Sequence, residues 1–198
     1  MDTHRTLSYG RGVPDEHELR LCGEVAGKRV IELGCTAAAN AVVLAVKGAK
    51  TMTIDPSAER LAEVRRLAEE SDVRVECHRG DLADLGFATS ASVDLVLCVG
   101  GLAAVDDIGR VFRQVHRVLR TDAPFVLAVP HPFSTMVDAG DVVRRAYWGD
   151  DAIHTVSGLF TALQRANFQV DVLIEPEPIG SQALVPSTLI VRARKLGV

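Results

Sequence analysis

Short runs of apolar, often β-branched residues alternate along this chain with longer stretches of helical periodicity. The first run, Arg29–Leu33, is of the kind that is buried on both faces of a parallel sheet. Such alternation is typical of α/β proteins, in which helices connect parallel strands. The sequence therefore predicts a doubly wound α/β sheet built from five βα units and a closing hairpin.

The same pattern predicts the individual elements. The final two strands are separated by a Pro- and Gly-rich loop that has no room for a crossover helix, so we expect them to pair antiparallel. The helix over 106–120 has the clearest apolar stripe, with acidic residues at its start and arginines at its end. Expected strands are 29–33, 51–54, 73–77, 93–98, 125–129, 168–174 and 188–193; expected helices are 15 to about 25, 38–47, one capped by Ser57, 106–120 and 156–167.

Composition narrows the classes of function. The chain has 198 residues, which suits one domain, and a net charge of −4 without long runs of either sign. Nucleic-acid binding needs clustered basic residues, so we expect no nucleic-acid partner. The longest uncharged stretch, Ala123–Val137, is too short to span a membrane, and the N-terminus lacks the apolar region of a secretory signal, so we expect a cytoplasmic protein without a membrane partner. Four widely spaced cysteines predict no metal site.

Ligands of doubly wound sheets bind beyond the carboxyl ends of the strands. Gly34 directly follows the first expected strand, where a tight turn would bring a ligand near backbone N–H groups. Asp55 follows the second strand at a spacing that lets a carboxylate accept both hydroxyls of a ribose. Asp81 and Leu82 follow the third strand and suit an exocyclic amine and its ring. Together these residues predict a nucleoside pocket.

The segments VIELGC, TIDPS, RGDLADL, VDLVLCVGGL and QVHRVLR occur in the order seen in class I S-adenosylmethionine-dependent methyltransferases. The chain resembles this family over 27–129, and the hairpin ending TLIVRARK extends the resemblance to nearly the whole chain. More closely, it is similar to small bacterial members thought to act on small molecules. The resemblance implies a Rossmann-like seven-stranded sheet of order 3-2-1-4-5-7-6 whose last strand is antiparallel.

The resemblance also implies residue roles. S-adenosyl-L-methionine would be the cofactor and S-adenosyl-L-homocysteine the product. Glu32 would organise the loop and face the methionine ammonium, Asp55 would hold the ribose hydroxyls, and Asp81 with Leu82 would hold the adenine. The full set of implied cofactor-binding residues is Glu32, Gly34, Cys35, Thr36, Asp55, Pro56, Asp81, Leu82, Cys98, Val99 and Gly100.

One departure from the family pattern concerns the glycine loop. Thr36 and Ala38 stand where the family has glycines. If position 36 required a left-handed backbone, a β-branched Thr would cost roughly 1–2 kcal/mol. An alternative interpretation is therefore a catalytically inactive methyltransferase-like binding or scaffold protein. A nicotinamide oxidoreductase fits poorly, because two of the three glycines of its fingerprint are absent.

The acceptor side is predicted from residues after the fifth strand. His131 follows that strand directly and is the candidate general base; the alternative is a structural histidine between two prolines. Tyr147 and Trp148 could wall an acceptor pocket or anchor the loop. We expect one domain over 1–198, with an N-terminal cap or lid (1–27), a cofactor-binding half (28–130) and an acceptor-side segment (131–198). The partner is a small-molecule acceptor, and a homodimer is left open.

Overall fold

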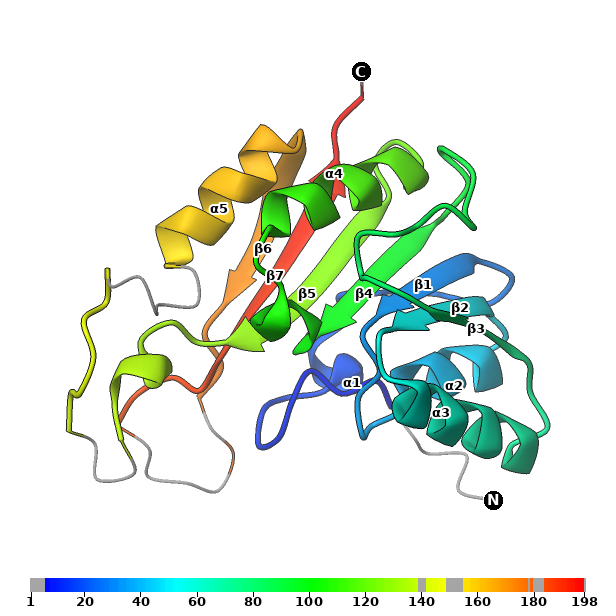
Figure 1. Ribbon diagram of the computed structural model, residues 1–198, viewed down its shortest axis with the longest axis horizontal. Helices are drawn as coiled ribbons and strands as arrows, with labels where there is room; N and C mark the ends of the chain where they lie inside the picture. The colour runs from blue at the N-terminus through cyan, green and yellow to red at the C-terminus, as the bar shows by residue number, and fades with distance from the viewer. Residues whose placement is uncertain (1–5, 139–141, 149–154, 178, 180–183, 198) are drawn as a thin grey trace.

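The computed structural model describes residues 6–138, 142–148, 155–177, 179 and 184–197. Within these residues the strands form one seven-stranded sheet of order β3-β2-β1-β4-β5-β7-β6 (Figure 1). The first five strands pair in parallel with their neighbours, whereas β7 is antiparallel to both β5 and β6. Both the predicted strand order and the antiparallel last strand are confirmed. The strands are β1 (Arg29–Leu33), β2 (Lys50–Asp55), β3 (Val75–Arg79), β4 (Leu95–Val99), β5 (Pro124–Pro130), β6 (Phe168–Ile174) and β7 (Thr188–Lys195).

The predicted helices between the strands are present, and the expected Ser57 cap is found; α2 has no side-chain cap. The side chains of Ser57, Asp107 and Thr155 each accept a hydrogen bond from a backbone N–H in the first turn. β3 is not followed by a helix, so four βα units occur rather than the expected five. The helices are α2 (Asn40–Val46), α3 (Ala58–Glu70), α4 (Ile108–Val118) and α5 (Val156–Arg165), with 3₁₀ turns η1 (Gly101–Ala104) and η2 (Ser134–Met136).

The helix expected from Asp15 to about Val25 is wrong beyond its first turn. Only α1 (Glu16–Leu19) is helical, because Arg20 adopts a left-handed conformation with φ 51°. The Glu16 carboxylate then accepts hydrogen bonds from the N–H groups of Leu21, Cys22 and Gly23. This one side chain replaces the helical backbone bonds that the following turns would have made.

The core lies on both faces of the sheet because successive strand residues point to opposite faces. In β1, Val30 packs with α2 and the N-terminal segment, while Ile31 packs with α4 and α5. Figure 1 shows α4 and α5 side by side over the strands from β4 to β6, and α2 and α3 beside β1 to β3. The described residues include no helix that is long and apolar enough to cross a membrane. Because both faces of the sheet are covered, a ligand can approach the strands at their ends.

Candidate functional site

A cavity of about 490 Å³ lies at the carboxyl ends of β1, β2 and β3, and we call it the carboxyl-end cavity. Five of the predicted cofactor-binding residues line it: Gly34, Asp55, Pro56, Asp81 and Leu82. Its volume is within the range of small-molecule sites. Its remaining lining residues are Arg60, Ala83, Gly101, Val105, Asp106, Asp107 and Arg110.

Asp55 ends β2 and is held by backbone groups from two loops. Its Oδ2 accepts the N–H of Cys35 at 2.7 Å, and its Oδ1 accepts the N–H of Ser57 at 2.7 Å. The guanidinium of Arg60 lies 3.6 Å from Oδ2, and the Asp55 side chain is only 1% exposed. A carboxylate has about four acceptor positions, so each oxygen retains capacity for one more donor. Asp55 therefore fixes the loop after β1 and can still accept a ligand hydroxyl.

Asp81 lies in the turn after β3 and is more open. Its Oδ1 accepts the N–H of Ala83 at 2.7 Å, and its Oδ2 lies 3.7 Å from Arg110 of α4. The neighbouring Leu82 is buried and joins the core on the α4 side of the sheet. An acidic oxygen and an apolar surface thus lie next to each other, as the sequence predicts.

The backbone at position 34 requires a glycine. Its φ of 78° is left-handed, and a Cβ at this position would lie 3.0 Å from the Cα of Gly101. A Cβ on Gly101 would in turn lie 2.7 Å from the carbonyl oxygen of Leu33. The loops after β1 and β4 therefore touch through two glycines.

Glu32 is fully buried beneath the start of α2. Its Oε2 accepts the N–H of Ala41 at 2.9 Å, whereas its Oε1 has no hydrogen-bond partner among the described residues. Burial, with a smaller contribution from the charge of Asp55, raises the pKa of this carboxyl to about 8 against the lowering effect of the Ala41 hydrogen bond. A buried carboxyl with an unsatisfied oxygen and a raised pKa is a typical feature of a functional site.

Cys35 and Thr36 follow Gly34 but do not line the carboxyl-end cavity. Burial raises the pKa of the Cys35 thiol to about 12. Thr36 is not among the described residues with positive φ; the left-handed residue of this loop besides Gly34 is Ala39, with φ 50°. The backbone strain of a left-handed conformation is therefore absent at Thr36 and present at Ala39.

Cys98 and Val99 end β4, Gly100 follows it, and none of the three lines the carboxyl-end cavity. Cys98 is buried, and burial raises the pKa of its thiol to about 12. Gly100 is exposed and has a left-handed φ of 69°. The structure thus brings the residues after β1, β2 and β3 together, whereas the three residues from β4 line no part of this cavity.

His131 lies just beyond β5 and is buried. Its Nδ1 accepts the N–H of Phe133 at 3.1 Å, which places the ring proton on Nε2. Nε2 then donates to Oε1 of Glu175 at 2.8 Å. Both ring nitrogens of His131 are therefore engaged within the protein in this arrangement.

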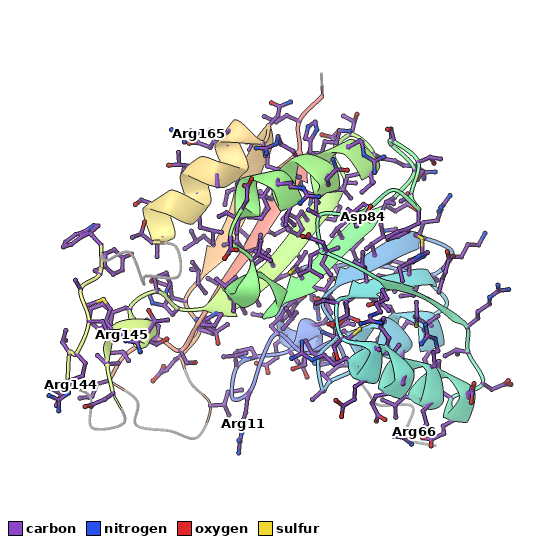
Figure 2. All side chains as sticks on the ribbon, in the orientation of Figure 1. Arg11, Arg66, Asp84, Arg144, Arg145 and Arg165 are labelled. Carbon is purple, nitrogen blue, oxygen red and sulfur yellow. The ribbon has the colours of Figure 1, made fainter. Side chains whose placement is uncertain are left out.

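The other acceptor-side residues point in different directions. Tyr147 Oη accepts the N–H of Val156, which begins α5, while the Trp148 side chain is exposed. Figure 2 shows Arg144 and Arg145 on the irregular segment after β5, pointing outward. Tyr147 thus anchors this segment. Histidines 4 and 154 lie outside the described residues.

Sequence reasoning missed Gly101, Arg60 and Arg110. Gly101 follows Gly100 after β4, and a pair of glycines behind a buried strand is a detectable signal. Arg60 and Arg110 each stand three residues after a helix N-cap, so they lie in the first turn, next to the carboxyl-end cavity. Their approach to Asp55 and Asp81 depends on tertiary placement, which no local pattern contains.

Comparisons with known proteins agree with this geometry. A family model described as a methyltransferase domain matches residues 31–127. A ubiquinone biosynthesis O-methyltransferase from Sodalis glossinidius is 30% identical over 105 residues, which are 53% of this chain and 42% of that protein. The chain thus spans less than half the length of this relative.

Solved structures match nearly the whole chain. An S-adenosylmethionine-dependent methyltransferase from Mesorhizobium loti superimposes with a TM-score of 0.74 at 25% identity, covering 89% of this chain and 94% of that one. A structure from Listeria monocytogenes assigned to the same class gives 0.75 at 21% identity, covering 92% and 98%. With the strand order, these matches show that the chain contains a methyltransferase domain, matched over residues 31–127, and has the fold of class I S-adenosylmethionine-dependent methyltransferases.

Proposed function

We propose that the protein transfers a methyl group from S-adenosylmethionine to a small-molecule acceptor. The observation that carries this proposal is the meeting of Gly34, Asp55 and Asp81, from the ends of three strands, around one cavity. The acidic oxygens suit ribose hydroxyls and an adenine amine, and Leu82 supplies an apolar surface for the ring. The buried, unpartnered Oε1 of Glu32 suits an ammonium group, reached directly or through water.

The cofactor supplies an electrophilic methyl group on a sulfonium. Transfer is an in-line displacement in which charge is neutralised, so the protein contributes mainly orientation and exclusion of water. Asp55 would orient the nucleoside, because its own position is fixed by two backbone N–H groups. The Gly34–Gly101 contact would limit the depth to which a ligand enters between β1 and β4.

We further propose an oxygen atom as the methyl acceptor, since the curated relative is named an O-methyltransferase. An oxygen acceptor needs a base, and His131 remains the candidate. Because Nδ1 accepts the Phe133 N–H and Nε2 donates to Glu175, His131 can take up a proton only after Nδ1 releases that N–H. The half-exposed Glu175 would then stabilise the resulting imidazolium.

A binding or scaffold role without catalysis is the second candidate. The observation that favours it is the limited access of a ligand to Asp55. The carboxylate already accepts hydrogen bonds from two backbone N–H groups, lies beside Arg60 and is almost fully buried. For a ligand to reach it, Arg60 must move. Its side chain is 65% exposed, so such movement is sterically free.

Thermal unfolding with S-adenosylhomocysteine tests the proposal, with NADH as the control ligand. At about a hundred times its dissociation constant, a ligand adds roughly 2.7 kcal/mol to stability. Each kcal/mol moves the melting temperature of a domain of this size by about 2–4 °C, so we expect a rise of about 5–10 °C. NADH should produce no rise.

Two matched variants test whether S-adenosylhomocysteine binds in the carboxyl-end cavity. Asp55→Asn should lose most of the rise with S-adenosylhomocysteine. Asp84→Asn, on the connection after β3 and labelled in Figure 2, should keep it, because Asp84 does not line the carboxyl-end cavity. No rise with either ligand in the unmodified protein would favour the scaffold role, and a rise with NADH alone would refute the proposed cofactor.

A further inference from the structure

Three basic residues form a row at the amino ends of β1, β2 and β3, at the opposite end of these strands from the carboxyl-end cavity. Arg29 begins β1 and pairs in register with Lys50, which begins β2. Arg74 immediately precedes β3, whose first residue pairs with the residue after Lys50. Positions at one level of neighbouring strands are about 4.8 Å apart and face the same side of the sheet. The three basic side chains therefore start from adjacent positions on one face.

No ion pair neutralises this row within the described part of the chain. Two acidic side chains lie beside the row, and neither forms an ion pair with it. Glu76 Oε1 lies 2.8 Å from His78 Nε2. Asp94 Oδ1 pairs with Arg120, and Asp94 Oδ2 accepts the backbone N–H of Arg29 rather than its guanidinium. Like charges at adjacent sheet positions are destabilising, so an anion bound here would relieve their repulsion.

The row lines a cavity of about 460 Å³, which we call the amino-end cavity. The rest of its wall is mostly apolar but includes one hydroxyl and one carboxylate: it consists of Ala45, Ala49, Thr51, Met52, Val73 and Glu76. Its volume is within the range of small-molecule sites, and the combination of apolar wall and few charged groups is typical of them. No residue of the amino-end cavity lines the carboxyl-end cavity.

The surrounding surface adds to the positive potential. The chain has only four lysines, at 28, 47, 50 and 195, and three of them are close to this end of the sheet. Lys28 immediately precedes β1, and Lys47 immediately follows α2. Clustered positive charge of this kind raises the local concentration of anions.

We propose that the amino-end cavity binds a small molecule that carries a phosphate group. A phosphate offers several anionic oxygens, which can contact two arginines and a lysine at once, and arginine binds phosphate oxygens in pairs. The apolar wall would hold the remainder of the molecule. A nucleic acid fits less well, because the basic residues line one cavity instead of an extended surface and the net charge of the chain is −4.

Inorganic pyrophosphate is the probe for this site, added at constant ionic strength adjusted with sodium chloride. The test variant is Lys50→Gln combined with Arg74→Gln, both of which are exposed. The control variant, Arg11→Gln combined with Arg165→Gln, removes the same charge from exposed arginines on the loop before α1 and on α5 (Figure 2). Pyrophosphate should raise the melting temperature of the unmodified protein and of the control variant. In the test variant, the rise in melting temperature should be at least threefold smaller.

Two further measurements separate this site from the carboxyl-end cavity. Without any ligand, at low salt, the test variant should melt at a higher temperature than the control variant, because repulsion within the row is removed. In saturating S-adenosylhomocysteine, the rise caused by pyrophosphate should persist. An equal rise in the test variant, no rise in the unmodified protein, or a rise abolished by S-adenosylhomocysteine would each overturn the proposal.

Discussion

At the scale of single residues, the end of β1 and the loop that follows it contain two groups in unfavourable states. Glu32 is a carboxyl buried with one oxygen unpartnered among the described residues, and Ala39 is a left-handed residue that has a Cβ. Unfavourable conformations of this kind are kept only where the surrounding interactions hold the residue in place, and they occur most often at functional sites. The two residues flank the turn that Gly34 begins, which supports the assignment of this turn to the site.

The pH dependence of stability should reveal Glu32. Its pKa is raised from 4.5 to about 8 by burial, so between these values the folded state binds a proton that the unfolded state has lost. The contribution of Glu32 to the free energy of unfolding is therefore greatest below about pH 4.5 and is lost as the pH rises to about 8. Glu32→Gln should reduce the decline in the free energy of unfolding between about pH 5.5 and 8 by a few kcal/mol, because a tenfold change in an acid dissociation constant corresponds to roughly 1.4 kcal/mol.

Urea unfolding at the two pH values measures this effect. Glu63→Gln, which replaces an exposed carboxyl on α3, should show the same decline as the unmodified protein. An undiminished decline in Glu32→Gln would mean that Glu32 is ionised in the folded protein.

Ala39→Gly should stabilise the protein. The left-handed conformation costs a residue with a Cβ about 1–2 kcal/mol, and glycine loses about 0.5–1 kcal/mol more backbone entropy on folding. The net gain in the free energy of unfolding, measured by urea denaturation, should be about 0.5–1 kcal/mol. Ala45→Gly, inside α2, should instead lose about 1 kcal/mol, and a loss at both positions would contradict the strain at Ala39.

At the scale of elements, the N-terminal segment is held to the sheet by apolar packing and a small set of hydrogen bonds. Residues from Leu7 to Val25 pack on the face that carries Val30 and α2. The backbone of Ser8 exchanges two hydrogen bonds with the amide of Asn40, at the start of α2. Glu16 accepts hydrogen bonds from three backbone N–H groups after α1 and from the hydroxyl of the buried Tyr9. The segment's shape therefore depends on one carboxylate.

Glu16→Ala should destabilise the protein by about 2–3 kcal/mol, because several partly buried donors lose their acceptor together. Chemical unfolding would measure this loss. Glu18→Ala, an exposed position in the same helical turn, should change stability by less than about 0.5 kcal/mol. Equal effects at the two positions would refute the role given to Glu16.

These elements also show what the sequence can predict. β1 and α4 were predictable because burial imposes a continuous apolar run or a single apolar stripe. The end of α1 was not predictable. The hydrogen bonds that Glu16 accepts from the following backbone do not alter the hydrophobic periodicity of the sequence. In the site, Gly34, Asp55 and Asp81 follow strands and were predictable, whereas Gly101 reaches the cavity only through the packing of β4.

At the scale of the whole molecule, the two ends of the parallel strands carry different charge. The carboxyl-end cavity is lined by four aspartates and two arginines, whereas three basic residues and one glutamate line the amino-end cavity. The sheet thus separates two cavities of opposite electrostatic preference. This separation lets the two proposals fail independently, since neither set of test variants touches the other cavity.

The position of β7 has a consequence for synthesis of the protein. β7 comes last along the chain but lies between β5 and β6, and in the described sheet β6 is bonded only to β7. While the ribosome is still making residues 188–195, the hydrogen-bonding edge of β5 is open and β6 has no strand to join. Exposed strand edges invite pairing with other chains. The nascent protein therefore depends on rapid closure of the β6–β7 hairpin onto β5, or on a chaperone that shields β5 until β7 arrives.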